Sequence, residues 1–233
     1  MIKKRNIRVR FLLLLPIAVV YSCRQHPDVS KMPVQQENPA SESIKQTSET
    51  HFIKFDPDSI PDLKIKGFTS DYSFKIGQNY LVVGYYRPVN GQIVLPDTED
   101  NWGDRLLFLN GKKSLIYKSN GVGDVYHYEP HFYKSTDGGK VIVICHLGYE
   151  YFFGGDVYLI ENETIRFIGA MDIENDGEEK TLIDILKIKS IDSTIVFSFD
   201  TDSLVLQPGN ESISVKNSNI RYEYSDDTLK LIR

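Results

Sequence analysis

The chain of 233 residues has only two cysteines and one tryptophan, and it carries fewer basic than acidic residues. Two cysteines cannot build the disulfide framework of a small secreted domain. The apolar stretch near the N-terminus, Phe11–Tyr21, is too short to cross the ~30 Å hydrocarbon core of a bilayer as a helix. Because the net charge is −5 and no Lys/Arg cluster is interleaved with aromatic residues, we expect no nucleic-acid partner.

Motifs that bind nucleotides or build hydrolytic sites are also missing. The sequence has no phosphate-binding glycine loop, no Gly-x-Ser-x-Gly nucleophile elbow and no Cys-x-x-Cys pair. It therefore favours a non-catalytic function without deciding the question. No cofactor is indicated beyond the calcium or zinc considered below.

The first 22 residues have the pattern of a secretory signal peptide. Five basic residues and no acidic residue precede the apolar segment Phe11–Tyr21: Lys3, Lys4, Arg5, Arg8 and Arg10. The segment ends in Val20-Tyr21-Ser22-Cys23, with an aliphatic residue three positions before the cysteine and a small residue directly before it. This ending resembles the lipobox of bacterial lipoproteins. An ordinary signal peptide with a chance cysteine and an uncleaved anchor are the alternatives.

The resemblance implies cleavage after Ser22 and attachment of acyl chains such as palmitate to Cys23. Several acyl chains hold a protein stably on a bilayer, so the membrane is the implied partner. Arg24 stands where an inner-membrane retention aspartate would otherwise follow the cysteine, which implies sorting to the outer membrane. The chain as a whole resembles lipoproteins of Bacteroidetes-type bacteria, which implies a Gram-negative cell envelope.

Loss of the signal peptide changes the rest of the chain in two ways. It removes five positive and no negative charges, so the net charge falls from −5 to −10. Lipidation of Cys23, which accompanies the cleavage, also leaves Cys145 without a partner for a disulfide. Because Cys145 lies in the apolar run Val-Ile-Val-Ile-Cys, we expect a buried thiol.

The remaining sequence divides into a tether and one globular domain. Residues 23–50 hold the lipidated cysteine and a Gln-, Ser-, Glu- and Pro-rich segment without aromatics, which predicts a disordered tether. Residues 51–233 are rich in aromatic and β-branched residues and predict a β-rich domain. The expected strands are Tyr80–Arg87, Arg105–Leu109, Ser114–Lys118, Lys140–Leu147, Asp156–Ile160, Thr164–Ile168, Thr194–Phe199 and Asn219–Tyr224. The segment Thr181–Ser190 fits both helix and strand, and we favour strand.

A weak internal repeat suggests how the strands are grouped. The segment Gly103–Asn110 is echoed by Gly155–Asn162, and each is followed by a second short apolar run. Both copies predict hairpins preceded by another strand, although a chance similarity explains the pattern equally well. We predict an all-β fold of antiparallel meanders packed as a sandwich, an open barrel or an incomplete propeller-like arrangement.

One candidate metal site is formed by histidines. His127, Glu129 and His131 alternate along an extended segment, so their side chains share one face, and His146 follows on the next expected strand. Two or three imidazoles with a carboxylate suit zinc, although Pro130 can interrupt the strand. Such a site predicts a metal-dependent hydrolase with Glu129 as general base or fourth ligand, while loop histidines are the alternative.

A second candidate metal site is acidic. The sequence Asp172-Ile-Glu174-Asn-Asp176-Gly177-Glu178 resembles the calcium loop of EF-hand proteins, whose alternating oxygen ligands surround the ion. The resemblance implies side-chain ligands at Asp172, Glu174 and Asp176 and a backbone-carbonyl ligand at Glu178. However, Ile183 stands at the twelfth position, where that family has a glutamate. A solvated acidic turn is the other interpretation.

Aromatic residues provide a candidate ligand-binding surface. Tyr149, Tyr151 and Phe153 lie between glycines, and Trp102 lies in an acidic segment. Exposed on one face, such rings would stack on sugars or grip a peptide, whereas a buried hairpin would use them as core. The aromatic-rich character of the whole domain favours the core interpretation. The lipobox, the long tether, the meander repeat and the missing catalytic motifs together favour a lipid-anchored envelope module of unknown ligand, for which a glycan and a protein are the candidates.

Overall fold

The computed structural model describes residues 48–61, 63–89, 92–93, 101–177, 179–200 and 204–233. The expected signal peptide, Cys23, the tether as far as residue 47, and Glu178 lie outside the described residues. One compact unit spans Lys45–Arg233. Its first strand begins at Glu49, just before the expected domain start at residue 51.

The prediction of an all-β antiparallel fold is confirmed. The only helical elements in the described residues are the single turn α1 (Leu182–Ile185) and a 3-10 turn at Asn217–Asn219. Nine strands form the largest sheet in the order β12-β11-β10-β9-β1-β13-β14-β17-β18, with every pair antiparallel. These strands are β1 (Glu49–Phe55), β9 (His127–Ser135), β10 (Lys140–Gly148), β11 (Phe152–Glu161), β12 (Thr164–Met171), β13 (Leu186–Ile191), β14 (Thr194–Phe199), β17 (Arg221–Ser225) and β18 (Thr228–Ile232).

A five-stranded sheet and two small hairpins complete the unit. The five-stranded sheet has the order β2-β3-β4-β7-β8. Its strands are β2 (Asp58–Ser59), β3 (Phe68–Ile76), β4 (Asn79–Tyr86), β7 (Arg105–Leu109) and β8 (Leu115–Lys118). The hairpins are β5 (Pro88–Val89) with β6 (Gln92–Ile93), and β15 (Leu204–Gln207) with β16 (Asn210–Lys216).

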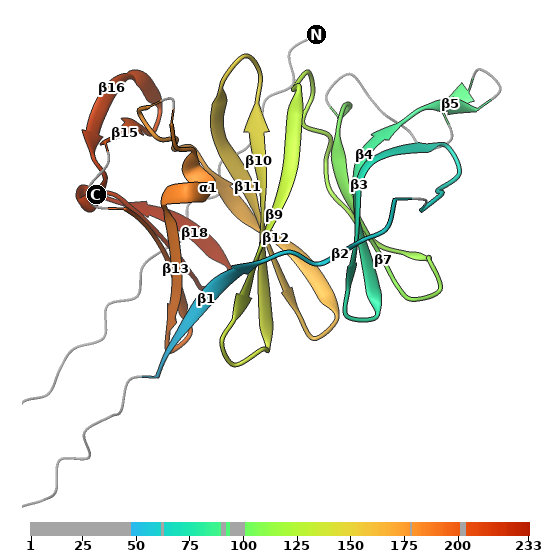
Figure 1. The fold of residues 1–233 in the computed structure, drawn as a ribbon, viewed down its shortest axis with the longest axis horizontal. Helices are drawn as coiled ribbons and strands as arrows, with labels where there is room; N and C mark the ends of the chain where they lie inside the picture. Colours follow the sequence, from blue (N-terminus) through green and yellow to red (C-terminus); the bar gives the residue numbers. More distant parts are fainter. Residues whose placement is uncertain (1–47, 62, 90–91, 94–100, 178, 201–203) are drawn as a thin grey trace, which may run out of the picture. The chain divides into compact units, whose positions relative to one another are not determined.

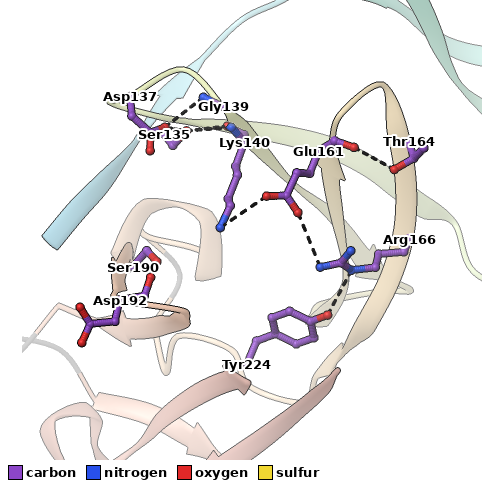
Figure 2. A network of polar contacts seen from close by, with 10 residues as sticks. All are labelled: Ser135, Asp137, Gly139, Lys140, Glu161, Thr164, Arg166, Ser190, Asp192 and Tyr224. Atoms are coloured by element: carbon purple, nitrogen blue, oxygen red, sulfur yellow. Dashed lines mark hydrogen bonds and ion pairs between the residues drawn. The ribbon is translucent and has the colours of Figure 1, made fainter. Parts of the chain in front are cut away.

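The nine-stranded sheet curls on itself until its first and last strands, β12 and β18, contact each other (Figure 1). Side chains from all nine strands and from α1 fill the enclosed core, among them Ile144, Phe197 and Tyr222. A row of polar contacts reinforces the closure (Figure 2). Lys140 Nζ lies 3.6 Å from Glu161, and Arg166 lies 3.9 Å from the same carboxylate.

Arg166 also joins the two edges of the sheet. Its Nε donates a 3.1 Å hydrogen bond to the Tyr224 hydroxyl of β17, and its guanidinium lies 5.8 Å from the centre of the Tyr224 ring (Figure 2). Because the Arg166 side chain remains 49% exposed, we expect this stack to contribute about 0.5–1 kcal/mol, the range of exposed cation–π contacts. Contacts from β12 to both β17 and β18 therefore hold the sheet in its nearly closed, barrel-like form.

A second core lies outside the curled sheet. The outer faces of β9, β10 and β11 pack on β4 and β7 of the five-stranded sheet, with Val143, Phe108 and Tyr158 at the contact. Cys145 is fully buried in this core as expected, and burial raises the pKa of its thiol. A third, smaller core around Val82 and Leu107 covers the opposite face of the five-stranded sheet.

The internal repeat corresponds to two three-stranded meanders, β4-β7-β8 and β10-β11-β12. They belong to different sheets, and their apolar faces form most of the second core. The two expected hairpins are therefore confirmed, and the sandwich and barrel alternatives both describe part of the molecule. Of the expected strands, seven coincide with β4, β7, β8, β10, β11, β12 and β14.

Two local predictions need correction. Thr181–Ser190 is not one strand: Leu182–Ile185 forms a helical turn before β13 begins at Leu186. The Asp184 carboxylate accepts hydrogen bonds from the Thr181 hydroxyl and amide, a capping box that starts a helix. The strand expected at Asn219 begins only at Arg221, because Asn217–Asn219 forms the 3-10 turn.

Closure of the sheet depends on a glycine at the meeting edges. Gly169 of β12 has a φ of +146°, and a Cβ at this position would lie 2.7 Å from Leu229 Cβ of β18. We expect Gly169→Ala to lower the free energy of unfolding by about 1–3 kcal/mol, the usual cost of overpacking. Urea denaturation measures this change.

A matched control is Gly139→Ala, whose Cβ would meet nothing closer than Asp137 Oδ1 at 3.6 Å. We expect this change to stay within about 0.5 kcal/mol. Equal unfolding free energies for the two variants would show that the edge contact does not constrain the sheet.

Candidate functional site

A buried histidine–carboxylate pair lies at one end of the curled sheet. His146 of β10 points to the same side as Ile142 and Ile144, and its Nε2 donates a 2.7 Å hydrogen bond to Glu174 Oε2. Both side chains are almost completely buried. The other Glu174 oxygen accepts hydrogen bonds from the amides of Asn175 and Leu182. The pair therefore fixes the start of α1 and the loop before it to the sheet.

The predicted histidine cluster is only partly brought together. His131 and His146 have ring centroids 6.1 Å apart, and His131 Nε2 lies 4.0 Å from Glu129 Oε2. His127 instead lies against Phe152, with centroids 5.5 Å apart. Burial, with a smaller contribution from Lys54, lowers the pKa of His131 to about 4, so this imidazole is neutral at pH 7. Within the described ranges, no group of three or more His, Cys, Asp or Glu side chains is arranged to hold a metal ion.

Pro130 does not interrupt the histidine-bearing strand. Strand β9 continues through it, because β1 pairs only with residues Phe132–Ser135. Pro130 therefore faces a neighbouring strand only on the β10 side, where its register partner is Cys145. A proline is tolerated where one side of a strand is unpaired.

The acidic loop distributes its carboxylates among different partners. Asp172 Oδ2 accepts a 2.6 Å hydrogen bond from the Gly209 amide, and Asp176 Oδ2 accepts one from the Ser214 hydroxyl. Glu174 binds His146 as described above. The three described carboxylates that the calcium resemblance implies thus tie the loop to β10 and to the β15–β16 hairpin. The fourth implied ligand, Glu178, lies outside the described residues.

An aromatic cluster lies exposed on the turn between β10 and β11. The Tyr149 ring stacks on Phe153 at 5.9 Å and meets the Tyr126 ring edge-on at 5.6 Å. Tyr126 is 69% exposed, Tyr149 41% and Tyr151 59%, whereas Phe153 is half-buried. The Tyr126 amide donates to the Gly148 carbonyl, which holds the two segments together. We call Tyr126, Tyr149, Tyr151 and Phe153 the aromatic turn.

The buried pair supports this turn from inside. Phe152, whose neighbours along the chain belong to the aromatic turn, stacks on the His146 ring with a 4.0 Å separation and an 8° angle. The turn is thus anchored through Phe152 and His146 to Glu174. Rings held in this way lose little conformational freedom when a ligand binds.

Trp102 and Tyr85 are exposed beside a hollow of about 380 Å³. Backbone hydrogen bonds from Val122 to Asp104 and from Gly123 to Trp102 join the tryptophan loop to residues 121–123. A Cβ on Gly103 would lie 2.1 Å from the Gly123 carbonyl oxygen, so only glycine permits this approach. We call Tyr85, Trp102 and Asp104 the tryptophan hollow. It is also lined by Asp124 and Val125, directly before Tyr126.

Several of these residues were not indicated by the sequence. Pairing of the strands brings Tyr126 beside Tyr149 and Tyr85 beside Trp102. No sequence motif around either tyrosine indicates this position. The pairing of His146 with Glu174 links two segments that the sequence had placed in separate candidate sites. Tyr149, Tyr151 and Trp102 are exposed and Phe153 is half-buried, so the favoured interpretation of these rings as buried core is wrong.

Comparison with known proteins provides no relative: no protein-family model, curated protein or solved structure matches the chain. Within the described ranges, no helix has the length and apolar character that a membrane span requires.

Removing His146 tests the role of the buried pair. We expect His146→Ala to lower the free energy of unfolding by about 3–5 kcal/mol, because the Glu174 carboxylate would stay buried without its partner. Chemical denaturation measures the loss. His51→Ala is the control, since His51 is exposed beside Glu49, and we expect a change within about 0.5 kcal/mol. Similar values for both variants would contradict a structural role for the pair.

Proposed function

We infer that the chain is a lipid-anchored binding module of the bacterial cell envelope, and that its ligand is a glycan. The observation that carries the glycan proposal is the exposure of flat aromatic rings on a rigid support. The lipid anchor is supported by the lipobox-like sequence at Cys23. Sorting to the outer membrane is supported by Arg24.

Both aromatic groups have the composition of a sugar-binding surface. In the aromatic turn, two rings stack on each other and three tyrosine side chains are exposed. In the tryptophan hollow, Trp102 and Tyr85 stand beside the carboxylate of Asp104. Ring faces pack on the C–H faces of sugars, and carboxylates accept hydrogen bonds from sugar hydroxyls. Residues 123–126 connect the two groups along the chain.

The electrostatics of the hollow fit a neutral polyhydroxy ligand. Burial raises the pKa of Asp104, with an added contribution from the nearby charge of Asp71. An acidic surface of this kind disfavours polyanionic ligands, whereas a neutral glycan brings hydroxyl donors. A protein ligand is the other partner class that the sequence suggests.

The metal-dependent hydrolase stays an untested prediction without a geometric argument in its favour. His146 Nε2 already contacts Glu174, and His127 lies against Phe152. His131 and Glu129 are the closest remaining pair of the predicted set. The described arrangement explains His127 and His146 as support for Phe152 beneath the aromatic turn.

Affinity electrophoresis in gels containing xylan, galactomannan or dextran tests the glycan proposal. We expect at least one polysaccharide to retard the protein, and Trp102→Ala or Tyr149→Ala to weaken binding about tenfold, equivalent to about 1.4 kcal/mol. The loss follows from removal of a stacking surface.

Ile53→Ala serves as a control, because Ile53 is a large apolar side chain that is 61% exposed on β1 and belongs to neither aromatic group. We expect it to bind the same polysaccharide unchanged. Absence of retardation in all three gels, or equal losses in all three variants, would argue against glycan binding through these rings.

Metabolic labelling tests the lipid anchor separately. We expect cells grown with radiolabelled palmitate to label the wild-type protein, and Cys23→Ala to abolish the label, because the Cys23 thiol and the new amino terminus are the expected acylation sites. Cys145→Ala should keep the label, since Cys145 is buried in the folded domain. An unlabelled wild-type protein would overturn the anchor and the proposed location.

A further inference from the structure

A separate cavity of about 350 Å³ lies where the edge of the five-stranded sheet meets the edge of the curled sheet. Its walls come from β8 and the segment after it on one side, and from β11 and β12 on the other. The volume falls within the range of about 300–1,000 Å³ that is typical of small-molecule sites. Tyr117, Asn120, Asp156, Tyr158 and Phe167 are among its lining residues.

The polar centre of this cavity is the carboxylate of Asp156. Asp156 Oδ2 accepts a 2.8 Å hydrogen bond from the Tyr128 hydroxyl, which lies 2.8 Å from the Tyr158 hydroxyl. Burial raises the pKa of Asp156, and the two tyrosines only partly offset this effect. The carboxylate is thus held in a fixed orientation in a poorly solvated place.

No basic side chain of the described residues forms an ion pair with Asp156. Lys118 borders the cavity, but its ammonium group lies 6.0 Å from the centre of the Tyr86 ring. Tyr86 belongs to the third core, on the opposite face of the five-stranded sheet from Tyr117. A desolvated carboxylate without a counterion is costly, and a bound cation would relieve that cost.

Aromatic rings surround the carboxylate. Tyr158 meets Tyr117 at a centroid distance of 6.2 Å and Phe167 at 5.4 Å, both at steep angles. Phe167 remains 48% exposed, so it stands at the mouth of the cavity. Ring faces attract cations, most strongly where water is excluded.

We propose that this cavity binds a small organic ammonium ion, with Asp156 as its counterion and the Tyr117 and Phe167 rings as its walls. Tyr128 and Tyr158 position the carboxylate. The site includes no residue of the aromatic turn or of the tryptophan hollow. The ammonium proposal can therefore be tested separately from the glycan proposal.

Calorimetric titration of the purified full chain with choline and with its uncharged carbon analogue 3,3-dimethyl-1-butanol tests the site. The two ligands have nearly the same shape, so their difference isolates the charge. We expect choline to bind, and the analogue to bind at least about tenfold more weakly.

Two variants connect binding to the cavity. We expect Asp156→Asn to weaken choline binding at least about tenfold, because asparagine keeps the shape and an acceptor for Tyr128 but removes the charge. Phe167→Ala, at an exposed position that does not threaten folding, should weaken binding as well. Glu223→Gln, on β17, removes an acidic charge elsewhere and should bind choline unchanged.

A pH series gives a further readout. The groups that face Asp156 are Tyr128 on β9, Cys145 on β10, Tyr158 on β11 and Tyr117 on β8, and burial raises the pKa of each, so they stay uncharged near neutral pH. Choline affinity should therefore rise with pH as Asp156 ionises, and should not do so in Asp156→Asn.

Three results would overturn the proposal. These are no heat of binding with choline at millimolar concentration, equal affinities for choline and its uncharged analogue, or full choline binding by both Asp156→Asn and Phe167→Ala. Binding of xylose in place of choline, lost in Asp156→Asn, would show instead that the cavity is a sugar subsite.

Discussion

Strand β10 must be covered on both faces, and the rest of the structure follows from this demand. Ile142, Ile144 and His146 point into the curled sheet, while Val143 and Cys145 point outward, and all of them are almost fully buried. Each fully buried aliphatic side chain contributes roughly 1.5–3 kcal/mol, which is lost if either face meets water. The curl of the nine-stranded sheet covers one face, and the five-stranded sheet covers the other. Neither layer is therefore an optional addition to the fold.

Burial on both faces also determines the form of the polar sites. A polar side chain on these strands needs a partner inside the protein, because water cannot reach it. His146 finds Glu174 on the inner side, and Asp156 finds Tyr128 and Tyr158 on the outer side. The first pair is complete in itself and anchors Phe152 beneath the aromatic turn. The second leaves a carboxylate without a counterion beside an open cavity, which distinguishes a structural pair from a site that can accept a ligand.

The sequence predicted the strands whose apolar runs are continuous and bounded by turn residues, such as Arg105–Leu109 and Thr194–Phe199. It did not indicate β1 or β3, where polar residues interrupt the apolar pattern and only pairing with neighbours reveals a strand, and it indicated only the first part of β9. The alternation of His127, Glu129 and His131 was apparent from their spacing. The partner of His146 was not apparent from the sequence, because only the arrangement of the strands in the folded protein brings Glu174 beside His146. The same reason explains why a calcium-like sequence supplies a histidine partner, and why Tyr126 joins Tyr149.

The segment from Tyr117 to Tyr126 links both proposed binding regions. Its first part lines the ammonium cavity, and its last part carries the rim of the tryptophan hollow and one ring of the aromatic turn. Its backbone amides hold it in place: the Gly121 amide donates a 2.7 Å hydrogen bond to the Asn101 side chain, and the Val122, Gly123 and Tyr126 amides donate to the Asp104, Trp102 and Gly148 carbonyls. Because these contacts use backbone atoms, the segment keeps its path when surface side chains change. We therefore expect that exposed rings can be exchanged at either region without loss of the fold, which is a property that the proposed binding function requires.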